Sequence, residues 1–93
     1  MIAEAVDEVA ELTKSSKWAA DQWYDFARVY AVASWNIADK KKEYADRAME
    51  LLQQAVKAGW KDAAHMKKDP DLVALKDRDD FKKLIADVEA KNK

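Results

Sequence analysis

The one histidine of the chain is the first candidate for acid–base or metal chemistry. His65 lies between Asp62 at i−3 and Asp69 at i+4, so on a helix all three side chains could share a face. A metal site or an acid–base pair would use these residue types, but one imidazole with two carboxylates is weak evidence for either. We expect His65 to lie on a solvent-exposed helix face.

Other chemistries lack the residues that they need. The chain has no Cys and one Gly, which excludes a disulfide framework, a thiolate zinc site, a Cys nucleophile and a Gly-rich phosphate loop. The acidic residues at 77–80 lack the spacing and the Gly of a calcium loop, so helix capping by Asp77 explains them. The run Lys40–Lys42 is predicted to be a loop. We therefore expect no catalytic, cofactor-binding or metal-binding residues and no enzyme activity.

Length and composition indicate one small all-α domain. The chain has 93 residues, of which 38% are charged and 49% hydrophobic, and that length leaves no room for a second domain. Its 17 basic and 18 acidic residues nearly cancel, which argues against binding to nucleic acid or to an anionic membrane. No apolar run reaches the ~20 residues of a membrane span, and a cytoplasmic location is expected.

Hydrophobic periodicity predicts four main helices and one or two short ones. The first three main helices cover about residues 2–13, from 19 to a point between 34 and 38, and 43–58. The fourth is the last helix of the chain, and Asp77 is expected to cap it. A short helix at about 61–67 and a brief turn opened by Asp69-Pro70 lie between the third and the last. Gly59 occupies the position where a left-handed residue ends the third helix.

The second helix carries two apolar stripes instead of one. Trp23, Phe26, Ala27 and Tyr30 follow the i, i+3, i+4, i+7 pattern of a packing face. A second stripe is offset by one position and comprises Tyr24, Arg28, Ala31, Val32 and Trp35. A helix that is apolar on two faces either lies between neighbours or presents one face to a partner.

Residues 23–30 resemble the first helix of a tetratricopeptide repeat, W-x-x-L-G-x-x-Y. Ala48, Leu52 and Ala55 resemble its second helix, A-x-x-x-F-x-x-A. The resemblance implies a stack of antiparallel helix pairs, with residues 1–16 as a truncated preceding helix, 19–58 as the best-matching pair and 60–91 as degenerate closing helices. Two departures stand out: the Pro after the second helix is absent, and the turn over Trp35–Glu43 is longer by nine positions.

The tail at 59–72, followed by Leu75, Asp77 and Phe81, resembles the closing tetratricopeptide segment of large bacterial serine/threonine kinases. None of the catalytic motifs of a kinase occurs in this chain. In that family a small residue is expected at the place of Arg28 and a small or polar one near Trp35. An Arg and a Trp on one face of a chain without Cys therefore also fit an engineered variant.

The resemblance implies that the second stripe lines a groove for peptide ligands. Tyr24, Arg28, Ala31, Val32 and Trp35 are then the protein-binding residues, because Trp, Tyr and Arg are enriched at interface hot spots. The alternative is that the chain folds back and fills its own groove. In that case Arg28 would need a carboxylate, which the apolar stripe does not supply. Trp18 and Trp60 are expected to cover edges of the core.

Three functions stay open at this point. The first is a non-catalytic module that binds another protein or peptide, or a second copy of the chain, through the second stripe. The alternative is a structural or regulatory C-terminal segment of a kinase without activity of its own. The third is a small helical enzyme that uses a Lys or His65 in an apolar pocket, which would require a strongly shifted pKa.

Overall fold

The computed structural model describes residues 2–15 and 17–91, and in this part of the chain it is all-α. The main helices are α1 (Ile2–Leu12), α2 (Ala20–Asn36), α3 (Lys41–Lys57) and α5 (Asp79–Lys91). A short helix α4 (Ala63–Lys68) and two 3₁₀ turns, η1 (Ala38–Lys40) and η2 (Pro70–Leu75), complete the described elements. The predicted all-α class is confirmed, and none of these helices is long and apolar enough to cross a membrane.

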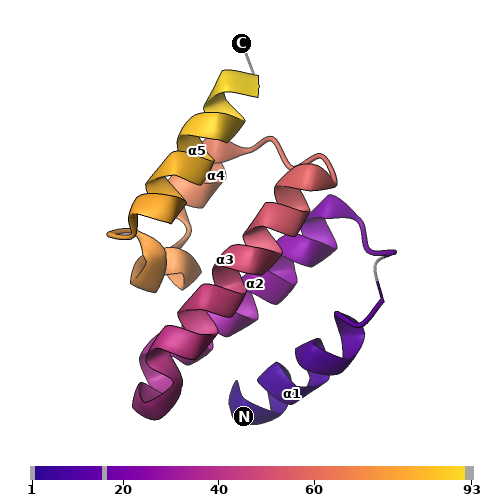
Figure 1. The fold of residues 1–93 in the computed structure, drawn as a ribbon, viewed down its shortest axis with the longest axis vertical. Helices are drawn as coiled ribbons and strands as arrows, with labels where there is room; N and C mark the ends of the chain where they lie inside the picture. Colours follow the sequence, from indigo (N-terminus) through magenta and orange to yellow (C-terminus); the bar gives the residue numbers. More distant parts are fainter. Residues whose placement is uncertain (1, 16, 92–93) are drawn as a thin grey trace.

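Helices α2 and α3 form the centre of the molecule. The chain turns at Ile37 and η1, and α3 returns alongside α2 (Figure 1). Ala27, Ala48, Leu52 and Ala55 are fully buried, and the three alanines let the two backbones approach closely. These four residues of the resemblance therefore pack in the core as predicted, whereas Phe26 is half-buried against it. A tetratricopeptide register of stacked helix pairs stays a prediction.

The connection between α2 and α3 is shorter than the predicted turn over Trp35–Glu43. Trp35 belongs to α2, while Lys41 and Lys42 begin α3, so the prediction of a loop for the whole lysine run is wrong. Basic residues are unfavourable in the first turn of a helix. Here carboxylates one turn further on offset this effect, since Lys40 pairs with Glu43 at 3.3 Å and Lys42 with Asp46 at 3.6 Å.

Helix α1 packs on one side of the central pair, and residues 60–91, which we call the closing segment, pack on the other (Figure 1). Val6 and Val9 of α1 are buried. The Trp18 indole N–H donates to the Leu12 carbonyl at 2.7 Å, and its ring lies edge-on to Phe26 at 5.2 Å. Trp18 therefore covers a core edge, as predicted.

The closing segment begins where Gly59 ends α3. Gly59 has φ +115°, its N–H donates to the Val56 carbonyl, and the Trp60 N–H donates to the Ala55 carbonyl. These are the two hydrogen bonds of a Schellman motif. Asp69 then caps η2, with Pro70 at the first position. Both features were predicted, and together they turn the chain back so that η2 packs on α2.

The start of α5 differs from the prediction. The helix begins at Asp79, and the Lys82 N–H donates to the Arg78 carbonyl, so Arg78 and not Asp77 holds the capping position. The Arg78 guanidinium pairs with Asp80 in the first turn of α5 and with Asp46 of α3, both at 2.9 Å. The hydrogen bond from Arg78 lowers the pKa of Asp80 below its usual range. The Arg78 side chain therefore ties the first turn of α5 to α3, but as a hydrogen-bond donor it does not replace an Asp cap.

Candidate functional site

The second stripe of α2 is divided between the core and the surface. Tyr24 is 1% exposed and Ala31 is fully buried, whereas Trp35 is 52% exposed and Val32 is half-buried. The expectation that all five residues face a partner is therefore wrong for Tyr24 and Ala31. The closing segment packs on this side of α2, so the chain fills part of its own groove.

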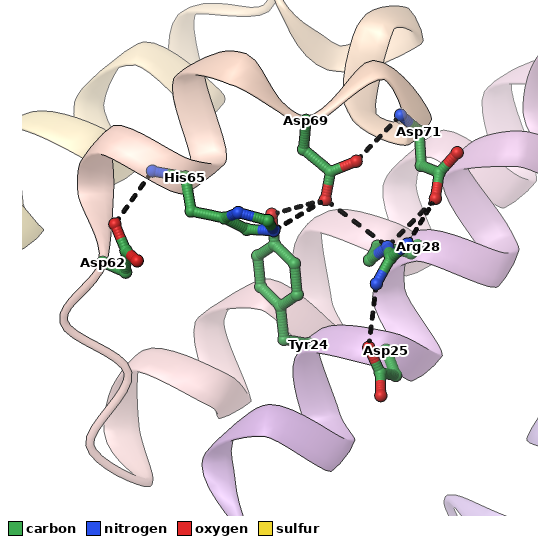
Figure 2. Close-up of polar contacts among 7 residues, drawn as sticks. All are labelled: Tyr24, Asp25, Arg28, Asp62, His65, Asp69 and Asp71. Atoms are coloured by element: carbon green, nitrogen blue, oxygen red, sulfur yellow. Dashed lines mark hydrogen bonds and ion pairs between the residues drawn. The ribbon is translucent and has the colours of Figure 1, made fainter.

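Tyr24 is held by the closing segment at both its ring and its hydroxyl. The ring stacks on Trp60 with centroids 3.9 Å apart and planes 5° from parallel. The hydroxyl donates to Oδ2 of Asp69 at 2.8 Å (Figure 2). Trp60 thus covers a core edge, as predicted, and it does so by lying on a tyrosine that was expected to bind a partner.

Asp69 is the buried carboxylate at the centre of this arrangement. Its side chain is 3% exposed. Oδ1 accepts the Asp71 N–H at 2.9 Å as the cap of η2, while Oδ2 accepts from Tyr24 and lies 3.4 Å from Nε of Arg28. Nε2 of His65 is 3.5 Å from the same oxygen. We call Tyr24, Arg28, His65, Asp69 and Asp71 the Asp69 cluster.

Arg28 supplies the positive charge of the cluster. Its guanidinium donates twice to Oδ2 of Asp71, from Nε at 3.0 Å and from Nη2 at 2.7 Å. Nη1 donates to Asp25 at 3.1 Å (Figure 2). The carboxylates that Arg28 needs, which the stripe does not supply, come from Asp69 and Asp71 at η2. The hydrogen bond to Asp71 raises the pKa of Arg28 above its usual range.

The environment of Tyr24 keeps its hydroxyl protonated. Burial raises the pKa of Tyr24 well above its usual range, and the hydrogen bond to the Asp69 carboxylate raises it further. Burial disfavours the phenolate, and a neighbouring negative charge acts in the same direction. Tyr24 therefore acts as a hydrogen-bond donor in the fold.

His65 lies at the exposed edge of the cluster. Its side chain is 49% exposed, in agreement with the expected exposed helix face, and its backbone N–H donates to Asp62, the cap of α4, at 2.9 Å. The described residues contain no group of three or more His, Asp or Glu side chains arranged to hold a metal ion. The pairing of Arg28 with Asp69 and Asp71 gives the cluster the composition of a structural ion-pair network that joins η2 to α2.

The outer part of the second stripe borders a shallow hollow. This hollow has a volume of about 360 Å³ and is lined by Asp25, Arg28, Val29, Val32 and Asp71. Among the described residues, Trp35 and Val73 are the large hydrophobic side chains that are exposed.

Comparison with known protein families, with curated proteins and with solved structures finds no match to this chain.

Sequence reasoning missed the pairing of Asp69 and Asp71 with side chains of α2. The Asp69-Pro70 pair indicated a cap, and this cap uses one carboxylate oxygen. The second oxygen pairs with Arg28 and accepts a hydrogen bond from Tyr24, which lie 41 and 45 positions away from Asp69 in the sequence. Local patterns carry no information on such a pairing. The available signal was the need of Arg28 for a carboxylate, combined with an acidic segment after the short helix.

Proposed function

We propose that this protein is a non-catalytic interaction module that binds another protein or peptide through the outer part of α2. The observation that carries the proposal is the exposure of Trp35, at 52%. Val32 and the partly exposed Arg28 complete the proposed contact surface. The proposal includes a cytoplasmic location and a tetratricopeptide-like scaffold, natural or engineered.

An exposed Trp beside a partly exposed Arg has the composition of an interface hot spot. Trp offers a large contact area, and Arg offers directed hydrogen bonds, which is why both are enriched among the residues that dominate binding energy. The side chain of Arg28 is 38% exposed, and its position is set by Asp25 and Asp71. A side chain that is already fixed loses little conformational freedom when a partner binds.

Tyr24 and Ala31 have a supporting role in this proposal. Both are buried, and Tyr24 bonds Asp69 and stacks on Trp60. These contacts hold α2 against the closing segment, so the contact surface is preorganised. The near-neutral net charge of −1 provides little long-range attraction for a charged partner. Recognition would therefore depend on direct contact with Val32 and Trp35.

The experiment selects peptide ligands for the immobilised protein from a displayed random library and measures their affinity for variants. Trp35→Ser should weaken the selected peptides by about 5- to 30-fold, which corresponds to the ~1–2 kcal/mol of a moderate hot spot. The melting temperature should stay nearly unchanged, since Trp35 is exposed. Val73→Ser is the matched control, because Val73 is 53% exposed but belongs to η2.

Light scattering on the same samples separates a peptide ligand from a second copy of the chain. A dimer that dissociates in Trp35→Ser and not in Val73→Ser would assign the surface to self-association. The proposal fails if the selected peptides bind Trp35→Ser as tightly as the unmodified protein, or if Trp35→Ser loses binding only because it unfolds.

A further inference from the structure

A second hollow lies within the closing segment, between α4 and α5. It has a volume of about 370 Å³, which is within the range of ~300–1,000 Å³ for small-molecule sites. Its floor is apolar and consists of Phe81, Ile85 and Ala86 of α5. Phe81 and Ile85 are 2% and 8% exposed, and Ala86 is exposed. The floor is therefore the outer edge of the hydrophobic core.

The rim of this hollow is positively charged. Lys67, Lys76 and Lys82 line it together with Glu89, so three positive charges and one negative charge give a local net charge of +2. This contrasts with −1 for the whole chain. The aliphatic stems of the lysines also extend the apolar wall below their ammonium groups.

One of the three lysines is already paired. Nζ of Lys67 lies 2.6 Å from Oε2 of Glu89, which joins α4 to α5 across the hollow. Lys76 and Lys82 form no ion pair within the described residues. An apolar floor next to two uncompensated ammonium groups is complementary to a ligand with an apolar body and one anionic end.

We propose that this hollow binds a small amphiphilic carboxylate, such as a medium-chain fatty acid. The hydrocarbon chain would lie on Phe81, Ile85 and Ala86, and the carboxylate would pair with Lys76 and Lys82. A neutral hydrophobe leaves both ammonium groups without a partner, and a highly charged anion such as a nucleotide places polar groups on the apolar floor. The site is separate from the contact surface on α2 and does not depend on the proposed function.

The test is a titration of the ¹⁵N-labelled protein with octanoate, in which the amide chemical shifts are measured at each concentration. Shifts should concentrate at residues 76 and 81–86. The dissociation constant should be on the order of 1 mM, because octanoate has only about ten non-hydrogen atoms and the site is open. Octan-1-ol has the same chain without the charge and should bind at least about 3-fold more weakly. Raising the ionic strength should weaken octanoate and leave octan-1-ol unchanged.

Variants separate the local charges from the net charge of the protein. The double variant Lys76→Gln/Lys82→Gln should weaken octanoate by about 3-fold or more. Lys57→Gln/Lys83→Gln is the matched control, because it also removes two positive charges but at another hollow; it should leave affinity within about 2-fold. Ala86→Glu adds a carboxylate to the floor of the site, at an exposed helix position, and should prevent binding.

Three results would overturn the proposal. Octanoate and octan-1-ol could bind equally well, the two double variants could bind octanoate alike, or the shifts could cluster on another face of the molecule. Circular dichroism on each variant confirms that the helices are intact. Peptide binding at Trp35 is measured in a separate experiment, so a negative result at one site does not affect the test of the other.

Discussion

At the scale of single residues, the two oxygens of Asp69 bind different partners. One oxygen caps η2, as the Asp-Pro pair predicts, and the other accepts the Tyr24 hydroxyl and faces Arg28. A carboxylate that is 3% exposed is stable only when it is hydrogen-bonded and paired. The cluster satisfies this requirement and fastens the closing segment to α2.

We predict that Tyr24→Phe destabilises the fold by about 1–3 kcal/mol at pH 7, as expected when a buried acceptor loses its donor. Phe retains an aromatic ring for stacking on Trp60, so the loss reports on the hydroxyl. The control is Tyr30→Phe, because Tyr30 is 6% exposed and its hydroxyl makes no hydrogen bond to the described residues. Urea unfolding measures both, and equal losses in the two variants would contradict the role of Asp69.

The loss of stability in Tyr24→Phe should also depend on pH. The pKa of Tyr24 is raised in the folded protein, so the folded state retains this proton where the unfolded chain loses it. The resulting stabilisation is fully present below about pH 10 and is lost as pH rises above it, by at most about 1.4 kcal/mol per pH unit. The difference between the unmodified protein and Tyr24→Phe should therefore shrink above pH 10. A difference that stays constant up to pH 11 would contradict the assignment.

At the scale of elements, periodicity predicted the bounds of the helices well but not which face of α2 the rest of the chain covers. The predicted bounds of the second helix, 19 to between 34 and 38, include the observed Ala20–Asn36, because apolar spacing is a local property. Which of its two stripes stays free is decided by η2, whose anchoring aspartates lie more than 40 residues away in the sequence. The ion pair between Arg78 and Asp46 of α3 was likewise missed, since its partners are far apart in the sequence.

The turn from α3 into the closing segment depends on Gly59. We predict that Gly59→Ala destabilises the fold by about 1–2 kcal/mol, because a side chain is strained at φ +115°. A Cβ at this position would meet no atom within 4 Å, so the loss would come from the backbone alone. Thermal unfolding measures the effect. Gly59→Asn is the control and should lose less, since Asn tolerates positive φ better; an equal or larger loss for Asn would contradict the explanation.

At the scale of the whole molecule, the chain covers part of the peptide groove that the resemblance to a tetratricopeptide repeat implies. The all-α class followed from composition and periodicity. A domain of this size buries a limited fraction of its surface, and packing η2 on α2 adds Leu72 and Leu75 to the core. The five predicted contact residues therefore have different roles: Tyr24 and Ala31 are buried, Arg28 joins elements, Val32 is half-buried, and Trp35 remains at the surface.

The most direct test of this account compares two arginines in urea unfolding. Arg28 and Arg47 have side chains that are 38% and 37% exposed, and both pair with acidic residues. They differ because Arg28 faces the buried Asp69, whereas Arg47 bonds Glu50 and Thr13. We predict that Arg28→Ala loses about 1–3 kcal/mol of unfolding free energy and Arg47→Ala at most about 1 kcal/mol. Equal losses, or a larger loss for Arg47→Ala, would contradict the claim that the Asp69 cluster fastens the closing segment to α2.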